Sequence, residues 1–188
     1  MVIKVIIKVE NILKKDISDK VIIFETDTVY GIGTSIDNLD GVKQIFNIKN
    51  RDFTKPLALL CANLDQVKSV VKNYEIGEDI ASKFWPGALT LIFEKQSKVD
   101  DLITSGFKTV GVRIPKSETA LKILEKNGPM AVTSLNLSTE PAIVKFDECL
   151  AYEDMVDYIV FGRDLNSPSS TVYDLLNKKI LRQGEIKI

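Results

Sequence analysis

Short apolar runs alternate with amphipathic stretches along most of this 188-residue chain, and this alternation limits the possible folds more than any other feature. Runs rich in valine and isoleucine predict strands, whereas apolar residues spaced three or four apart predict helices. Strands are expected at residues 2–9, 21–24, 57–61, 89–93, 109–114, 130–132, 156–161, 170–176 and in a last run that reaches 181–184. Helices are expected at residues 38–50, 64–73, 77–84 and 117–127. This order, with consecutive strands near the end, predicts an α/β fold with a twisted mixed sheet, part parallel and part antiparallel, flanked by helices.

The composition is that of a globular domain with one core. The chain is 45% hydrophobic, so we expect residues 1–188 to form a single domain. The formal charge of −1 argues against a general nucleic-acid binder. Cys61 and Cys149 have no CxxC spacing and are expected to be packing residues in a reducing compartment. No apolar stretch approaches bilayer-spanning length, so a soluble, cytoplasmic protein without membrane contact is expected.

The chain contains no histidine. This excludes Ser-His and Cys-His nucleophile pairs within one chain, histidine-ligated zinc and an imidazole general base. The remaining chemistry uses carboxylates, lysine, arginine, hydroxyls and backbone amides. Such groups suit phosphate or nucleotide substrates, for which positioning and charge neutralisation dominate catalysis.

A polar segment, residues 25–33, directly follows the strand predicted at 21–24. We expect a loop at the carboxyl end of that strand, which is where open α/β sheets bind their ligands. Thr26, Thr28 and Tyr30 offer hydroxyl groups, and Gly31 and Gly33 would allow backbone amides to approach a ligand closely. A hydrogen-bonded turn without a ligand explains the same residues equally well.

Three cations occupy unusual places in the pattern. Lys49 stands where the helical spacing of 38–50 requires an apolar residue, and Arg51 follows it. A solvated basic helix end is the alternative explanation for both. Arg113 ends an apolar strand and therefore requires an anionic partner, either a protein carboxylate or a ligand.

Polar groups recur in five separate loops, at Thr26 to Tyr30, Lys49 with Arg51, Arg113, Ser134 with Asn136, and Ser170-Thr171 with Arg182. Cations that offset a triphosphate's charge and hydroxyls that fix its geometry would form a phosphate site. The chain has no G-x-x-x-x-G-K-S/T sequence, and its G-x-G lacks the third glycine of a dinucleotide fingerprint. It is therefore expected to be neither a P-loop nor a Rossmann enzyme.

Taken in order, seven motifs resemble those of the YrdC/TsaC-like threonylcarbamoyl-adenylate synthases. They are T-D-T-V-Y-G at 26–31, K-x-R at 49–51, K-P-L at 55–57, W-P-G-x-L-T at 85–90, V-R-x-P at 112–115, S-x-N at 134–136, and the closing S-T-V at 170–172 with R-x-G at 182–184. They span nearly the whole chain, which is similar to the short, single-domain form of the family. The resemblance implies the family's fold with an open ligand cleft.

The resemblance also implies a nucleotidyltransferase reaction. L-threonine and bicarbonate form a carbamate, whose oxygen attacks the α-phosphorus of ATP to give threonylcarbamoyl-AMP and pyrophosphate. The family implies catalytic roles for Lys49, Arg51, Ser134 and Asn136, and substrate or nucleotide binding by Thr26, Thr28, Tyr30, Lys55, Arg113, Thr133, Ser170 and Arg182. Magnesium is expected to arrive with ATP rather than at a dedicated protein site.

A partner is implied as well, because the family's product is used by a transferase that modifies adenosine beside the anticodon of tRNA. Weak direct binding of tRNA is compatible with this. The sequence departs from the family's usual residues at Glu25, Ala88, Leu135 and Thr139, and a histidine that many relatives carry after K-P-L is absent. These departures bear on loop shape and threonine selectivity.

Two other functions remain open from the sequence. One is a carbamoyl-adenylate activity like that of the related domain in hydrogenase-maturation carbamoyltransferases. The other is a non-catalytic module that binds tRNA or double-stranded RNA, which the balanced charge disfavours.

Overall fold

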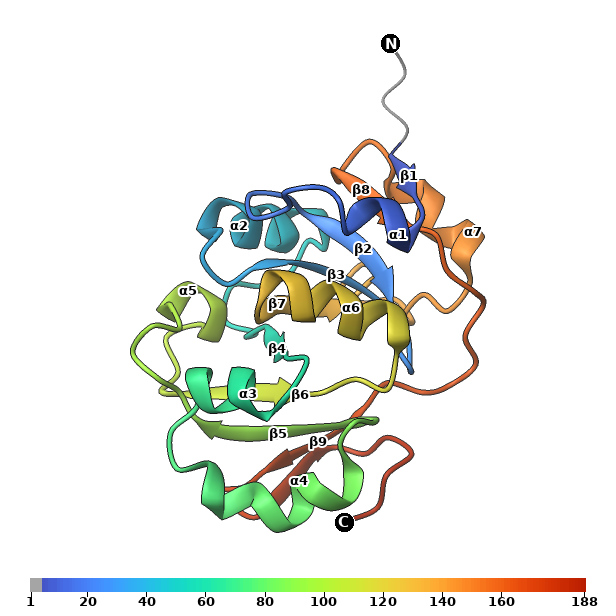
Figure 1. Ribbon diagram of the computed structural model, residues 1–188. Helices are drawn as coiled ribbons and strands as arrows, with labels where there is room; N and C mark the ends of the chain where they lie inside the picture. Colours follow the sequence, from blue (N-terminus) through green and yellow to red (C-terminus); the bar gives the residue numbers. More distant parts are fainter. Residues whose placement is uncertain (1–4) are drawn as a thin grey trace.

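A computed structural model describes residues 5–188, and its ten strands form one mixed sheet in the order β1-β8-β2-β3-β7-β4-β6-β5-β9-β10 (Figure 1). The strands are β1 (Ile6–Ile7), β2 (Ile22–Glu25), β3 (Tyr30–Ser35), β4 (Ala58–Leu60), β5 (Leu89–Glu94), β6 (Thr109–Arg113), β7 (Met130–Ser134), β8 (Tyr158–Val160), β9 (Thr171–Asp174) and β10 (Lys179–Arg182). β2 pairs parallel with β8 and antiparallel with β3, and β5 pairs parallel with β9 and antiparallel with β6. The predicted mixed sheet is confirmed.

The α-helices are α1 (Val9–Ile12), α2 (Leu39–Ile48), α3 (Leu64–Val70), α4 (Glu78–Phe84), α5 (Asp101–Thr104), α6 (Glu118–Asn127) and α7 (Phe146–Cys149), with short 3-10 turns at Tyr74–Gly77 and Leu150–Tyr152. The two longest begin at side-chain caps. The Asn38 side chain accepts a hydrogen bond from the Gly41 amide at 3.0 Å, and the Ser117 hydroxyl accepts one from the Ala120 amide at 3.2 Å. Such caps satisfy amides that have no partner inside the helix, so both helices begin where the sequence predicts.

Two apolar clusters lie on opposite faces of the sheet. On β2, Ile23 belongs to the larger cluster and its neighbours Ile22 and Phe24 to the smaller one, as the alternation of side chains along a strand requires. The larger cluster contains the buried residues of α2 to α5, and the smaller one those of α1 and α6. The sheet is thus flanked by helices on both faces.

The first predicted strand differs from its expected bounds. Part of residues 2–9 lies outside the described range, and within that range β1 covers only Ile6–Ile7. Lys8 already caps α1, which carries Ile12 into the smaller apolar cluster. Since the edge strand β1 pairs on one side only, with β8, it gains little from further extension and the chain turns into a helix instead.

The predicted loop 25–33 is also too long. Only residues 26–29 connect β2 to β3, because Tyr30 to Gly33 pair with β2 and Gly31 to Gly33 also pair with β7 on the other side. A Cβ atom added at Gly31 would lie 2.9 Å from Val132 Cγ1, and one at Gly33 would lie 2.7 Å from Val132 Cγ2. Both glycines therefore make room for the side chain of Val132 on the neighbouring strand, and Gly31 also lines a cavity.

No helix within residues 5–188 combines the length and the apolar character needed to cross a membrane.

Candidate active site

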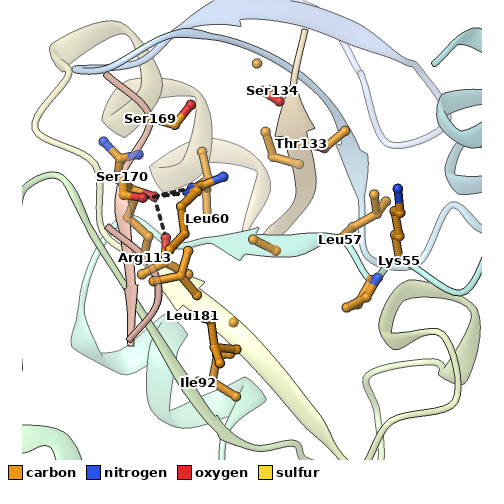
Figure 2. A pocket seen from close by; sticks show the side chains of 18 of the residues that line it. Lys55, Leu57, Leu60, Ile92, Arg113, Thr133, Ser134, Ser169, Ser170 and Leu181 are labelled. Atoms are coloured by element: carbon orange, nitrogen blue, oxygen red, sulfur yellow. Dashed lines mark hydrogen bonds between the residues drawn. The ribbon is translucent and has the colours of Figure 1, made fainter. Parts of the chain in front are cut away.

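A cavity of about 890 Å³ lies beside the loop 26–29, at the carboxyl end of β2 (Figure 2). Strands β4, β5, β6 and β7, the segment 51–57 and the β9–β10 hairpin also line it, so the cavity joins segments from both halves of the chain. In Figure 2, Lys55 and Leu57 lie on one side of it, and Ser169 and Ser170 on the opposite side. This volume is within the range of protein sites that bind nucleotide-sized ligands.

Ten of the twelve predicted site residues line the cavity. They are Thr26, Thr28, Tyr30, Arg51, Lys55, Arg113, Thr133, Ser134, Ser170 and Arg182. Lys49 and Asn136 do not line it. Five further polar residues line the cavity although the sequence does not predict them as site residues: Thr54, Thr90, Ser169, Asp174 and Asn177. Thr90 and Ser169 lie within or beside quoted motifs, whereas nothing in the sequence pattern marks Asp174 or Asn177.

The loop 26–29 is held by the hydroxyl of Thr26. This hydroxyl donates to the carbonyl of Val29 at 2.7 Å and accepts from the amide of Thr28 at 3.1 Å. The turn considered for this segment is therefore present, and it leaves Asp27 and Thr28 facing β6. Thr26 shapes the loop, and Asp27 and Thr28 reach the neighbouring arginine.

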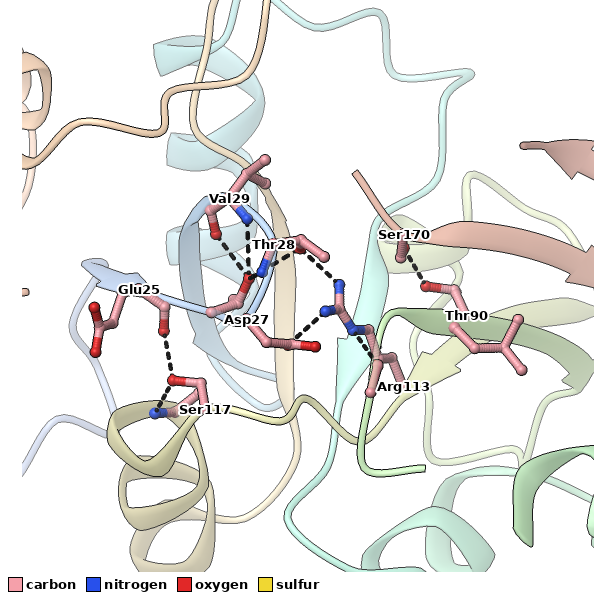
Figure 3. Close-up of polar contacts among 12 residues, drawn as sticks. Glu25, Asp27, Thr28, Val29, Thr90, Arg113, Ser117 and Ser170 are labelled. Atoms are coloured by element: carbon pink, nitrogen blue, oxygen red, sulfur yellow. Dashed lines mark hydrogen bonds and ion pairs between the residues drawn. The ribbon is translucent and has the colours of Figure 1, made fainter. Parts of the chain in front are cut away.

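Arg113, at the end of β6, forms a hydrogen bond with each of its three guanidinium nitrogens (Figure 3). Its Nη2 lies 2.5 Å from Asp27 Oδ1, its Nη1 donates to Thr28 Oγ1 at 3.0 Å, and its Nε donates to the Gly87 carbonyl at 2.8 Å. The protein thus supplies the carboxylate that a buried arginine requires. The same side chain borders the cavity, so it can also contribute positive charge to a bound ligand.

Lys49, at the end of α2, is only 1% exposed, which excludes the solvated helix end considered for it. Its Nζ donates to the carbonyl of Ser134 at 2.5 Å, to the carbonyl of Asn136 at 2.8 Å and to Asn136 Oδ1 at 2.9 Å. The Ser134 hydroxyl donates to the same Oδ1 at 2.7 Å. Burial, together with the nearby charge of Arg51, lowers the pKa of Lys49 to about 8. Lys49 therefore holds the segment 134–136 from the side away from the cavity. Of Lys49, Ser134 and Asn136, Ser134 alone is among the described residues that line the cavity.

Two further arginines point at the cavity with neutral partners. Arg51 donates from Nε to the Lys55 carbonyl and from Nη2 to the Pro56 carbonyl, both at 2.9 Å. Arg182 donates from Nε to the Ser170 carbonyl at 2.9 Å and from Nη2 to Ser170 Oγ at 3.0 Å. These contacts fix the direction of each guanidinium without neutralising it.

The surroundings of the cavity disfavour the positive charge of all three arginines. Burial lowers the pKa of Arg51, Arg113 and Arg182, and the positive charge of Arg182 lowers the pKa of the other two further. Of the carboxylates on or beside the cavity wall, Asp27 pairs with Arg113, and Asp174 accepts hydrogen bonds from the residues that follow it, including both amide groups of Asn177. The cavity therefore has an excess of positive charge that an anionic ligand would offset.

Aliphatic side chains also border the cavity. Leu57, Leu60, Ile92, Val132 and Leu181 border it, with Ile92 and Leu181 close together in Figure 2. A site whose wall combines cations with aliphatic side chains suits a ligand that has both a charged group and an organic group.

A family model with the description "Telomere recombination", for the Sua5, YciO and YrdC proteins, matches residues 16–184. The chain belongs to the Sua5/YciO/YrdC family. Its sequence is 40% identical over 125 residues to a threonylcarbamoyl-AMP synthase of Pyrococcus abyssi, a match that covers 65% of this chain and 37% of that protein. It is 32% identical over 186 residues to a putative threonylcarbamoyl-AMP synthase of Methanocaldococcus jannaschii, covering 96% of this chain and 88% of that one.

Solved structures of this family have the same fold. A crystal structure of P. abyssi Sua5 complexed with L-threonine matches with a TM-score of 0.88 and 32% identity, over 97% of this chain and 57% of that one. The structure of E. coli YciO matches with a TM-score of 0.83 at 24% identity, over 95% of this chain and 90% of that one, which shows the shared fold alone. This chain thus covers 37% and 57% of the two P. abyssi chains and 88% of the M. jannaschii relative.

The residues that depart from the usual family motifs lie outside the cavity wall. Glu25, Ala88, Leu135 and Thr139 are all absent from the described residues that line it. Leu135 is fully buried in the larger apolar cluster. These four residues can therefore affect the cavity only through the residues that line it.

Proposed function

We propose that this family member is an L-threonylcarbamoyladenylate synthase, which converts L-threonine, bicarbonate and ATP into threonylcarbamoyl-AMP and pyrophosphate. The observation that carries the proposal is the group of three arginines, Arg51, Arg113 and Arg182, around one cavity whose paired carboxylate, Asp27, offsets only one of them. A triphosphate supplies the missing negative charge. The names of the P. abyssi and M. jannaschii relatives support the choice of reaction.

The chemistry places modest demands on the protein. The amine of threonine adds to bicarbonate with loss of water, and an oxygen of the resulting carbamate attacks the α-phosphorus of ATP. The bond from that phosphorus to the bridging oxygen of the β-phosphate breaks, and pyrophosphate leaves. Because the nucleophile belongs to the substrate, catalysis rests on positioning and on charge stabilisation, which a site without histidine can provide.

The geometry supports a division of roles. Arg51 and Arg182, whose partners are neutral, would bind the phosphates, and Thr133 and Ser134 on β7 would bind the carbamate. Lys49 and Asn136 would act by holding Ser134 in place, since neither borders the cavity. Thr28, Tyr30 and Lys55 would complete the wall around threonine and the nucleotide.

Magnesium would enter as part of the substrate MgATP. No group of three cysteine or acidic residues within 5–188 is arranged to hold a metal ion. Asp174, the acidic residue on the cavity wall, already accepts hydrogen bonds from neighbouring amides. The ion would therefore be held chiefly by phosphate oxygens and water, and would reduce the charge on the leaving pyrophosphate. The product would pass to a transferase that acts on tRNA in the cytoplasm.

The test is pyrophosphate release from MgATP, with threonine and bicarbonate each present or omitted, while labelled bicarbonate is followed into an AMP-linked product. We expect release that requires both substrates, with label in the adenylate. Release without threonine would favour a carbamoyl-adenylate activity, and a folded protein that binds RNA but releases no pyrophosphate would favour an RNA-binding module.

Two variants connect the assay to the site. Arg51→Ala should reduce turnover strongly, because it removes a cation that borders the cavity. Lys43→Ala removes one positive charge from an exposed pair with Asp40 and should leave turnover unchanged. Equal turnover in the two variants would remove Arg51 from the proposed site.

A further inference from the structure

Residues 161–170, here called the connection, lead from β8 to β9 without forming a helix or strand of their own. β8 and β9 lie in different parts of the sheet, separated by β2, β3, β7, β4, β6 and β5. In Figure 1 the connection runs along one side of the molecule between them. Its last two residues, Ser169 and Ser170, border the cavity. The path of the connection therefore decides where one cavity wall lies.

The peptide groups at Arg163 attach the connection to the ends of the loop 26–29. The amide of Arg163 donates to Glu25 Oε2 at 3.0 Å, and the carbonyl of Arg163 accepts from the hydroxyl of Tyr30 at 2.8 Å. Glu25 is the last residue of β2, and Tyr30 is the first of β3. One residue of the connection is thus bound on both sides by the two residues that flank this loop.

The carboxylate of Glu25 is well placed to hold the amide of Arg163. Its side chain is 14% exposed, and its second oxygen, Oε1, accepts from Thr119 Oγ1 on α6 at 3.0 Å. The guanidinium of Arg163 is 77% exposed, and its Nε lies 4.0 Å from Oε2. The charged pair is consequently weak, and the backbone hydrogen bond is the main contact between the two residues.

The close approach depends on Gly162. A Cβ atom at this position would lie 2.5 Å from the hydroxyl oxygen of Tyr30 and 2.9 Å from Glu25 Oε2. A side chain at this position would therefore require either the connection or the tips of the Tyr30 and Glu25 side chains to move. The hydroxyl of Tyr30 is turned toward Arg163, so its polar end serves this contact rather than the cavity.

The far end of the connection is attached separately. Ser170 Oγ lies 2.9 Å from Thr90 Oγ1 and accepts from Arg182 Nη2 at 3.0 Å. The arginine proposed to bind phosphate is thus oriented by the residue that ends the connection. We expect a shift at Arg163 to reach Ser169 and Ser170 through residues 164–168, of which Asp164 and Leu165 also form hydrogen bonds with Phe146 and Val144.

We propose that Glu25 is a positioning residue, which together with Tyr30 holds the peptide of Arg163 and so sets the positions of Ser169, Ser170 and Arg182 for the bound nucleotide. The nucleotide part of this statement rests on the proposed function. The attachment of the connection by Glu25 does not, and it is measured independently of activity.

The experiment compares Glu25→Ala with Glu25→Gln. Glutamine can accept from the Arg163 amide through its oxygen and donate to Thr119 through its nitrogen, so it retains both contacts. Alanine retains neither. Asp157→Ala is the matched control, because Asp157 Oδ2 likewise accepts a backbone hydrogen bond, from Val21 at 2.9 Å, at the other end of β2.

Two quantities are measured in all three variants. The first is hydrogen exchange at the Arg163 amide, which we expect to be faster by about tenfold or more in Glu25→Ala, as the loss of a hydrogen bond to a charged group implies. The second is the KM for MgATP, which should rise about tenfold on the same basis while kcat changes less. Glu25→Gln and Asp157→Ala should resemble the original protein in both.

Several results would overturn the proposal. Unchanged exchange at Arg163 in Glu25→Ala would show that the carboxylate does not hold the connection. Faster exchange with an unchanged KM would show that the attachment has no effect on the site, and equal effects in Asp157→Ala would indicate general destabilisation. Should Glu25→Ala not fold, Tyr30→Phe, which removes only the hydroxyl bonded to Arg163, takes its place with the same expectations.

Failure of the proposed function would look different. The unsubstituted protein would then release no pyrophosphate with threonine and bicarbonate, while the exchange rates of Glu25→Ala and Glu25→Gln would still decide whether Glu25 holds the connection.

Discussion

The ion pair between Asp27 and Arg113 offers a quantitative test of how the cavity is built. The side chains of Asp27 and Arg113 are 15% and 6% exposed, and Asp27 Oδ1 lies 2.5 Å from Arg113 Nη2. At an effective dielectric constant of about 20, charges at this separation attract by about 7 kcal/mol, part of which offsets the cost of removing both from water. Asp27→Ala leaves the buried guanidinium without a counterion.

Removing one member of a buried pair typically costs about 3–5 kcal/mol, so we expect Asp27→Ala to lower the free energy of unfolding by that amount. Asp27→Asn retains a side-chain oxygen for the hydrogen bond but loses the charge, and it should fall between Asp27→Ala and the original protein. Urea denaturation at neutral pH measures both. Glu94→Gln is the matched control, because the Lys72–Glu94 pair has a similar 2.9 Å separation but is 45% and 42% exposed. Its loss should be about 1 kcal/mol or less.

The same variants test the excess of positive charge in the cavity. Without Asp27, Arg113 adds an uncompensated charge, so inorganic triphosphate should bind Asp27→Asn at least as tightly as it binds the original protein, and should restore part of the lost stability. Calorimetric titration with triphosphate gives the affinity. A stability loss in Asp27→Ala no larger than in Glu94→Gln, or a clear fall in triphosphate affinity in Asp27→Asn, would refute this account of the site.

Three further predictions concern other parts of the molecule. Burial lowers the pKa of Lys49 from 10.5 to about 8, so burying its charged form lowers the stability of the folded protein below pH 8, and this loss disappears as the pH rises from 8 to 10.5. Relative to Lys49→Met, the original protein should gain about 3 kcal/mol of unfolding free energy between pH 8 and 10.5. A difference in denaturation midpoints that does not change with pH would contradict this. Arg182→Ala should raise the KM for MgATP more than it lowers thermal stability, because the guanidinium is held by Ser170 at the cavity wall, and a large fall in Tm with KM unchanged would show a structural role instead. Burial raises the pKa of both Cys61 and Cys149 to about 12, so neither thiol should react with iodoacetamide until the protein is unfolded in urea, and mass spectrometry of the labelled native protein checks this.

The helices and most strands could be predicted because their signals are local. Asn38 and Ser117 begin helices by accepting hydrogen bonds from amides three residues ahead, and the helical period alone marks Lys49 as a lysine in an apolar position. The short helices α1, α5 and α7 are not predicted from the sequence. Four residues are too few to show a helical period.

The remaining differences arise from contacts between distant parts of the chain. Gly31 and Gly33 suggest a ligand loop by their spacing, but Val132 of β7 decides that they belong to a strand. The sequence showed that Arg113 needs an anion, and only the fold brings Asp27 to it. Likewise, nothing near Glu25 in the sequence points to its contact with Arg163.

The order in which the walls of the cavity occur along the chain has a consequence for synthesis on the ribosome. β9 joins the sheet at the edge of β5, and Ser170 and Arg182 come from this last part of the described chain. A nascent chain that ends before β9 can already contain the pair of Asp27 and Arg113, but it leaves β5 as an open edge and lacks one cavity wall. Binding of the proposed nucleotide would therefore require β9 and β10 to be in place, and chains truncated before residue 169 should expose β5 to chaperones and fail to bind ATP.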